Sequence, residues 1–198
     1  MKWRRLDSDP NDIRIHLTCP QRCAFARDYY RRQGFNGEAN QLIVNLKMGV
    51  DAPQSRLKYR TSAIKQFASE LTSAIPDGST VAPVPPTIRP DGSKPDTRIH
   101  EVLMELKRMP SHQSTSVVDV VGWKRPKQRA HEGGPRSPEE LIPLLTWLAK
   151  DVRPPEFLYV CDDMITSGGT FEAVRNVVGQ FWPQTVVFGV FWTRAVEE

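Results

Sequence analysis

Long hydrophobic runs, cysteines and repeats are all scarce in this chain of 198 residues. No apolar stretch approaches the roughly 20 residues that a membrane-spanning helix needs. The first residues, MKWRRLDSDPNDIRIH, contain no apolar segment typical of a signal peptide. Three cysteines, an odd number without paired spacing, argue against a disulfide framework and indicate a reducing compartment. We therefore expect a cytoplasmic protein that does not associate with a membrane.

Lysine is missing from the last quarter of the chain. Residues 151–198 contain three arginines, no lysine and seven acidic residues, whereas the remainder contains 24 basic and 16 acidic residues. This basic part favours an anionic ligand, such as a phosphorylated metabolite or a nucleic acid. With 39% hydrophobic residues, the chain is long enough for one substantial domain, with or without a cap.

Predicted strands and helices alternate through the last two thirds of the chain. Apolar residues at helical spacing predict a helix over 62–75, and Asp96 or Thr97 is a suitable N-cap for another over 99–109. Further helices are expected at 23–32, 139–152 and 170–181, and residues 40–50 remain ambiguous. Apolar or β-branched runs predict strands at 79–86, 116–123, 157–161 and 185–193.

Continuous apolar strands such as FLYV and VVFGVF are typical of a parallel sheet that is covered on both faces. The predicted fold class is therefore α/β, a mostly parallel sheet flanked by helices. Residues 1–78 lie outside the alternating pattern and are expected to form a mostly helical cap. Residues 79–198 are expected to form the core, with ligands at the carboxyl ends of its strands.

The stretch CDDMITSGGT, residues 161–170, carries the clearest chemistry. A strand, two adjacent aspartates and a turn of hydroxyls and glycines lead into a predicted helix. Gly168 and Gly169 allow a tight turn, and the backbone N–H groups at the helix start suit a phosphate. Asp162 and Asp163 would repel that phosphate unless they face the vicinal hydroxyls of a ribose, and Mg²⁺ would offset their like charge. The pattern predicts a ribose 5-phosphate site.

These residues resemble the 5-phosphoribosyl 1-diphosphate (PRPP) motif of the type I phosphoribosyltransferases, in which apolar residues and an acidic pair precede T-[TS]-G-G-T. VAPVP, at 81–85, is similar to the corresponding strand of ComF-type competence proteins. The resemblance covers roughly residues 79–195 and implies a type I phosphoribosyltransferase fold. It implies PRPP contacts for the following residues: Asp162, Asp163, Met164, Ile165, Thr166, Ser167, Gly168, Gly169 and Thr170.

The resemblance also assigns two loops. The loop after the first core strand would bind the pyrophosphate, and its cations are Arg89, Lys94 and Arg98. Residues 124–136 stand where the family has a mobile catalytic loop that closes over the substrate. Positive charge for the departing pyrophosphate would come from Lys124, Arg125, Lys127 and Arg129, and His131 is an optional acid or base.

The implied reaction transfers ribose 5-phosphate from PRPP to a nitrogen-containing acceptor and releases pyrophosphate. Mg²⁺ would arrive with PRPP, Asp162 and Asp163 would be the catalytic residues, and Asp163 would also be the general base. A homodimer is expected because type I relatives are often dimers. Two alternatives stay open: a non-catalytic PRPP sensor or nucleic-acid-associated protein, and a hydrolase that cleaves an N-glycosidic bond.

Two features of the first 36 residues have other interpretations. His16, Cys19 and Cys23 are spaced H-x2-C-x3-C, but a zinc site needs a fourth ligand, and we interpret these residues as structural. Aromatic residues interleaved with arginines would suit single-stranded nucleic acid, although a helix with one apolar face and one basic face explains the same pattern more simply. The residues concerned are Arg27, Tyr29, Tyr30, Arg31, Arg32 and Phe35.

Overall fold

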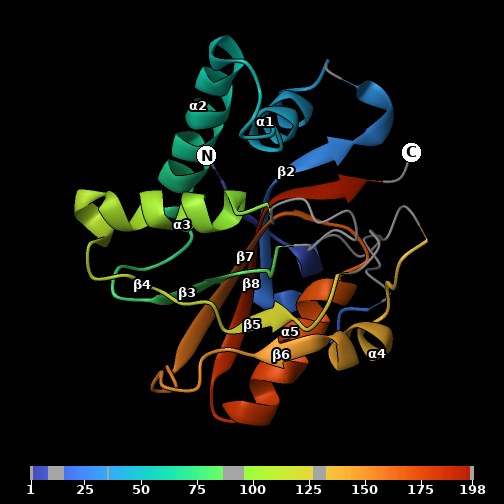
Figure 1. Ribbon diagram of the computed structural model, residues 1–198, viewed down its shortest axis with the longest axis vertical. Helices are drawn as coiled ribbons and strands as arrows, with labels where there is room; N and C mark the ends of the chain where they lie inside the picture. Colours follow the sequence, from blue (N-terminus) through green and yellow to red (C-terminus); the bar gives the residue numbers. More distant parts are fainter. Residues whose placement is uncertain (1, 9–15, 35, 87–95, 127–132, 197–198) are drawn as a thin grey trace.

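The main sheet carries most of the architecture. The computed structural model describes residues 2–8, 16–34, 36–86, 96–126 and 133–196. Within them, a six-stranded sheet has the order β1-β2-β8-β7-β3-β4 (Figure 1). Only β1 pairs in an antiparallel manner, and the other neighbours are parallel, which confirms the mostly parallel α/β sheet. The strands are β1 Arg4–Arg5, β2 Cys23–Tyr30, β3 Thr80–Pro83, β4 Ser116–Val117, β7 Phe157–Ile165 and β8 Val186–Val196.

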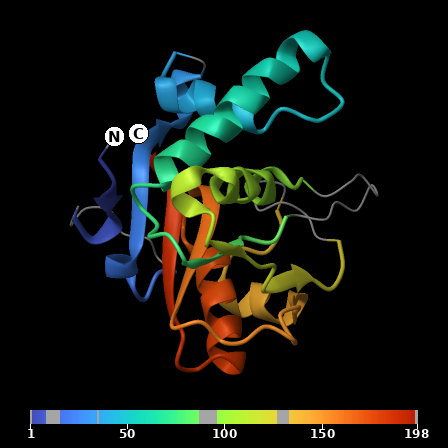
Figure 2. The same ribbon diagram turned by 90° about the vertical axis from the view of Figure 1, so that its left-hand side faces the viewer.

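Helices cover both faces of this sheet. On one face lie α1 (Glu38–Leu46), α2 (Gln54–Leu71) and α3 (Arg98–Arg108), whereas α5 (Gly169–Phe181) lies on the other (Figures 1 and 2). Beside α5 are the short helix α4 (Pro138–Leu141) and a small antiparallel sheet of β5 (Val121–Trp123) and β6 (Leu145–Trp147). No helix among the described residues is long and apolar enough to cross a membrane.

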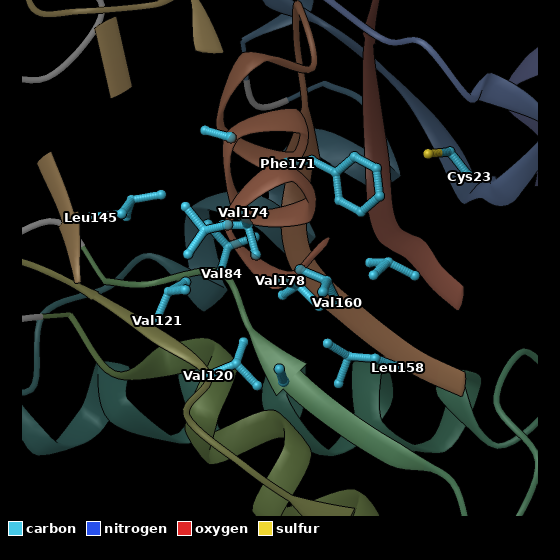
Figure 3. Close-up of a cluster of buried hydrophobic side chains, with 14 of the residues drawn as sticks. Cys23, Val84, Val120, Val121, Leu145, Leu158, Val160, Phe171, Val174 and Val178 are labelled. Atoms are coloured by element: carbon cyan, nitrogen blue, oxygen red, sulfur yellow. The ribbon is translucent and has the colours of Figure 1, made fainter. Parts of the chain in front are cut away.

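Two hydrophobic clusters separate the layers. Figure 3 shows the cluster on the α5 side, where Val174 and Val178 of α5 gather with Val160 of β7 and Val84. The opposite cluster joins the other three helices to the sheet, and in it Phe67 of α2 stacks on Trp192 of β8 at a centroid distance of 4.6 Å. Residues 158–161 of β7 enter the two clusters alternately, as expected for a strand buried on both faces.

The helix predicted at 23–32 is wrong, because this segment forms β2. Cys23 and Phe25 point into the cluster on the α5 side, whereas Ala26 enters the opposite one. β2 pairs with β8 along most of its length and with β1 at Ala24 and Phe25. Residues 1–78, expected to form a mostly helical cap, therefore contribute two strands to the main sheet as well as α1 and α2.

Two other predictions need correction. The strand predicted at 116–123 is divided into β4 in the main sheet and β5 in the small one. The helix predicted at 139–152 ends after one turn, and the chain continues as a 3-10 turn and β6. Pro143 explains this ending, since it has no N–H to continue the helix and its ring clashes with the preceding turn. The remaining predicted strands and the helices at 62–75, 99–109 and 170–181 are confirmed, with shifted boundaries.

Candidate functional site

The acidic pair and the glycine turn lie at the switch point of the sheet. β3 and β7 are parallel neighbours, but α3, which follows β3, packs on one face of the sheet and α5, which follows β7, packs on the other. Open α/β sheets bind their ligands at such a point, outside the carboxyl ends of the strands. Residues 162–170 span the end of β7, the turn and the first two residues of α5.

Asp162 and Asp163 belong to β7 itself, not to the connecting loop as the sequence predicts. β7 extends to Ile165 because it stays paired with β8 through Ile165 and Arg194. The side chain of Met164 packs against one hydrophobic cluster and that of Ile165 enters the other. These two side chains therefore anchor the end of the strand on both sides.

Asp163 is buried and faces two cations. Its Oδ2 lies 3.1 Å from both Lys47 Nζ and Arg98 Nη2, and it accepts a hydrogen bond of 3.2 Å from Arg98 Nε. Arg98 begins α3 and is also paired with Asp96, whereas Lys47 directly follows α1. Asp162 is half-buried, and its Oδ1 accepts a hydrogen bond of 2.8 Å from the backbone N–H of Asp163.

The pKa values of the two carboxyl groups are shifted in opposite directions. Burial raises the pKa of Asp162, and the adjacent charge of Asp163 raises it further. Burial would also raise the pKa of Asp163, but Lys47 and Arg98 together outweigh it and lower that pKa. The pair therefore carries one firmly ionised member and one member that holds a proton more readily.

The glycine turn has the conformation and close contacts that require glycine. Gly168 has φ +85°, in the left-handed region, and a Cβ there would stand 2.5 Å from Leu17 Cγ. A Cβ on Gly169 would collide with the carbonyl oxygen of Arg136. The backbone N–H of His16 donates to Ser167 O at 3.2 Å. Residues 16, 17 and 136 thus pack directly against the turn.

A polar network holds the segment before β2 against α5. The buried carboxylate of Glu172 accepts a hydrogen bond from Thr18 Oγ1 at 2.8 Å and is paired with Arg175. Arg175 Nη2 also donates to Thr18 Oγ1 at 2.8 Å. This network fixes Thr18 two residues after the His16 contact, so the N-terminal region is part of the wall of the site.

Of the other predicted site residues, only some can be placed. Arg98 reaches the acidic pair, but its partners are carboxylates. Lys124 and Arg125 are exposed and follow β5, whose Trp123 donates from Nε1 to Pro85 O beyond β3. Lys124 Nζ donates to Pro143 O at 2.9 Å. The remaining predicted residues lie outside the described part of the chain: Arg89, Lys94, Lys127, Arg129 and His131.

Sequence reasoning missed the residues that approach the site from distant segments. Lys47 stands in a segment of ambiguous pattern and Leu17 belongs to no motif, whereas Arg136 is the last residue of the predicted catalytic loop. Lys47 follows α1 and Leu17 precedes β2, so both reach the site through tertiary packing that no local pattern indicates. Only the requirement for two consecutive glycines suggests that other backbone approaches the turn closely.

The structure weakens two interpretations of the N-terminal region, a zinc site and a basic surface for nucleic acid. Burial raises the pKa of the Cys19 and Cys23 thiols, and the described residues contain no group of three metal-ligating side chains. Arg27, expected on a basic surface, instead pairs with Glu70 and Glu38. Arg31 and Arg32 are exposed, whereas Tyr29 packs partly into the core. Phe35 lies outside the described residues.

Comparison with protein-family models found no match to this chain, and comparison with curated proteins found no relative.

Proposed function

We propose that this protein is a PRPP-binding phosphoribosyltransferase of the type I fold, which transfers ribose 5-phosphate to a nitrogen-containing acceptor and releases pyrophosphate. The observation that carries the proposal is the position of one short segment. Asp162, Asp163 and the T-S-G-G-T turn lie together where β7 leads into α5, at the switch point between β3 and β7.

The geometry of the turn supports a phosphate at the start of α5. α5 is 13 residues long, and the N–H groups of its first turn have no partner within the helix. Such groups, with the helix dipole, favour a dianionic phosphate. The side chains of Thr166, Ser167 and Thr170 are exposed or half-buried and add hydroxyl donors at the same end.

The acidic pair supports a ribose beside that phosphate. Carboxylate oxygens accept hydrogen bonds from vicinal hydroxyls. Asp162 and Asp163 are consecutive near the end of β7, just before the glycine turn. The attacking nitrogen forms a bond to the anomeric carbon as the bond to pyrophosphate breaks, and the pyrophosphate keeps the electron pair. Arg98 stands at the start of α3, close enough to this centre to meet the leaving group.

Mg²⁺ enters this proposal as part of the substrate. The described residues hold no cluster of three metal-ligating side chains, so the metal is expected to be bound mainly by the oxygens of PRPP. Asp163 already contacts two cations, so we propose that it acts as a fixed anion and not as the general base that the resemblance implies.

The decisive experiment is calorimetric binding of PRPP with and without Mg²⁺, followed by pyrophosphate release with a panel of nucleobases. The double variant Asp162→Asn, Asp163→Asn should lose at least about tenfold in affinity, because each lost charge-assisted hydrogen bond contributes about 1.5–3 kcal/mol. The control is Asp51→Asn, Asp151→Asn, which neutralises two exposed aspartates elsewhere. Equal affinity in both double variants would refute the site assignment.

The same measurements separate the alternatives. Tight binding without pyrophosphate release from any acceptor would indicate a sensor. Release of pyrophosphate from PRPP with water as the only acceptor, or of free base when a nucleotide replaces PRPP, would indicate a hydrolase. RNA or single-stranded DNA binding that weakens steeply with salt would indicate the nucleic-acid-associated protein.

A further inference from the structure

Lys47 is the most unusual residue near the acidic pair, because it comes from a region with no recognised role. It follows α1, whose Ile43 and Leu46 are buried in the hydrophobic cluster beneath the sheet. The Lys47 backbone N–H donates to Ile43 O at 2.9 Å, which fixes the start of the side chain. Its ammonium then reaches Asp163 Oδ2 at 3.1 Å, although the side chain is 41% exposed.

Arg98 alone would leave Asp163 only partly neutralised. The guanidinium of Arg98 is shared between Asp96, which lies two residues before it, and Asp163 of β7. Lys47 supplies the second positive charge on the same oxygen of Asp163. Among the described residues, neither cation forms an ion pair with Asp162, which accepts its hydrogen bond from a backbone N–H.

We propose that Lys47 is a positioning residue of the acidic pair: it holds Asp163 as a fixed anion, so that Asp162 is the carboxyl group that gives up its proton when the ligand binds. The identity of the ligand rests on the proposed function, but the role of Lys47 does not.

Charged groups from two other elements face the pair. Asp96 and Arg98 face it from the start of α3, Lys47 faces it from α1, and the pair itself lies on β7. Two adjacent ionised carboxylates repel one another. Both cations form their ion pairs with Asp163, and at Asp162 their charge does not outweigh burial and the charge of Asp163. Hydroxyl groups of a bound sugar donate to a carboxylate, so they favour ionised Asp162. The released proton goes to the solvent.

Carboxyl titration of the ligand-free protein tests Lys47 directly. Aspartate would be labelled with ¹³C at the carboxyl carbon, and the signals of the pair would be assigned with Asp162→Asn and Asp163→Asn. In Lys47→Met, the pKa of Asp163 should rise by about one pH unit, because an opposite charge at this range lowers a carboxyl pKa by about 1–3 units. Lys47→Arg should restore the titration of the wild type.

The matched control is Lys65→Met, which removes an exposed lysine from α2 and should leave both carboxyl groups unchanged. If Lys47→Met fails to fold, judged by far-UV circular dichroism, Lys47→Gln replaces it. An Asp163 titration that does not respond to the loss of Lys47 would overturn the proposal. So would a wild-type pair in which Asp163 takes up its proton before Asp162 as the pH falls.

Proton release on ligand binding tests the role of Asp162. Calorimetry of PRPP with Mg²⁺ near pH 7.5, where the 5′-phosphate is already almost fully dianionic, would be run in buffers of different ionisation enthalpy. It should show proton release that disappears in Asp162→Asn. Release that persists in this variant would refute the role of Asp162. If PRPP does not bind at all while the Asp163 titration still follows Lys47, the proposed function fails and the positioning role of Lys47 stands.

Discussion

At the scale of single residues, the two neighbouring aspartates should affect stability in opposite directions. The pKa of Asp162 is raised, so the folded protein keeps a proton that the unfolded chain loses, and stability falls as the pH rises from about 4 through the raised pKa. Asp162→Asn removes this cost and should stabilise the fold by about 2 kcal/mol at pH 8, with little gain near pH 4. Urea unfolding at both pH values measures the difference.

Asp163→Asn is the matched comparison. The pKa of Asp163 is lowered, so its contribution to stability is present above its ordinary pKa and is lost as the pH falls through the lowered value. Neutralising it leaves Lys47 and Arg98 facing each other and should destabilise the fold by about 2 kcal/mol or more at neutral pH. Changes of the same sign in the two variants would contradict the assigned charge states.

Two glycines of α5 provide a second test at this scale. Gly169→Ala places a methyl group against the Arg136 carbonyl, so the chain around residue 136 must move. Gly179, in the same helix, has open space around it, and Gly179→Ala should stabilise the protein by about 0.5–1 kcal/mol. Gly169→Ala should instead destabilise it by about 1 kcal/mol or more and weaken PRPP binding. Thermal unfolding and calorimetry distinguish these outcomes, and equal stabilisation by both changes would contradict the close contact.

At the scale of elements, Glu70 joins three parts of the fold. Its side chain lies in the last turn of α2. It accepts two hydrogen bonds of 2.6 Å from Arg27 of β2 and one of 2.6 Å from Trp192 Nε1 of β8. Glu70→Gln removes the charge from a largely buried pair and should cost about 2 kcal/mol in urea unfolding. Glu105→Gln, which breaks the more exposed pair with Arg108, should cost at most about 0.5 kcal/mol. Equal costs would show that burial does not strengthen the Glu70 network.

Helices and strands with a clear pattern of apolar residues were predictable from the sequence. Those that depend on pairing with distant segments were not. α2 and α5 follow from helical spacing, and β7 and β8 follow from continuous apolar runs. β2 is half-buried over much of its length and carries Arg27 and Asp28, because these charged side chains pair with Glu70 and Arg194 from distant segments. Its strand character depends on pairing with β8, which lies more than 150 residues away.

The candidate site was predictable only where one segment of the chain makes it. Residues 162–170 lie together because they are consecutive between a strand and a helix. Lys47 and residues 16 and 17 reach the same place through tertiary packing, so no local signal predicts them there, whereas residue 136 ends the loop that the resemblance assigns to the site. The pairing of Arg98 with Asp163 likewise depends on the parallel arrangement of β3 and β7.

At the scale of the whole molecule, the structure predicts that residues 79–198 do not fold alone. Without residues 1–78, β8 loses its partner β2 and becomes an exposed edge, and the cluster around Trp192 loses Phe67 and Leu71 of α2. Exposed edges and uncovered apolar faces promote aggregation. The shortened chain should therefore elute as aggregates in size-exclusion chromatography and show no cooperative thermal transition.

A cut in the intact protein provides the control for this deletion. A protease site inserted after Gly78 would fall in an exposed turn, where Gly78 has φ +77° and no neighbouring atom within 4 Å of a Cβ. After cleavage, the two pieces should elute together as one species of the original size, because they share both the sheet and the core on the α2 side. A folded, monomeric 79–198 fragment would contradict this expectation and show that residues 1–78 are a dispensable cap. Joint elution, together with failure of the fragment alone, would show that the chain upstream of β3 completes the sheet on which the acidic pair is held.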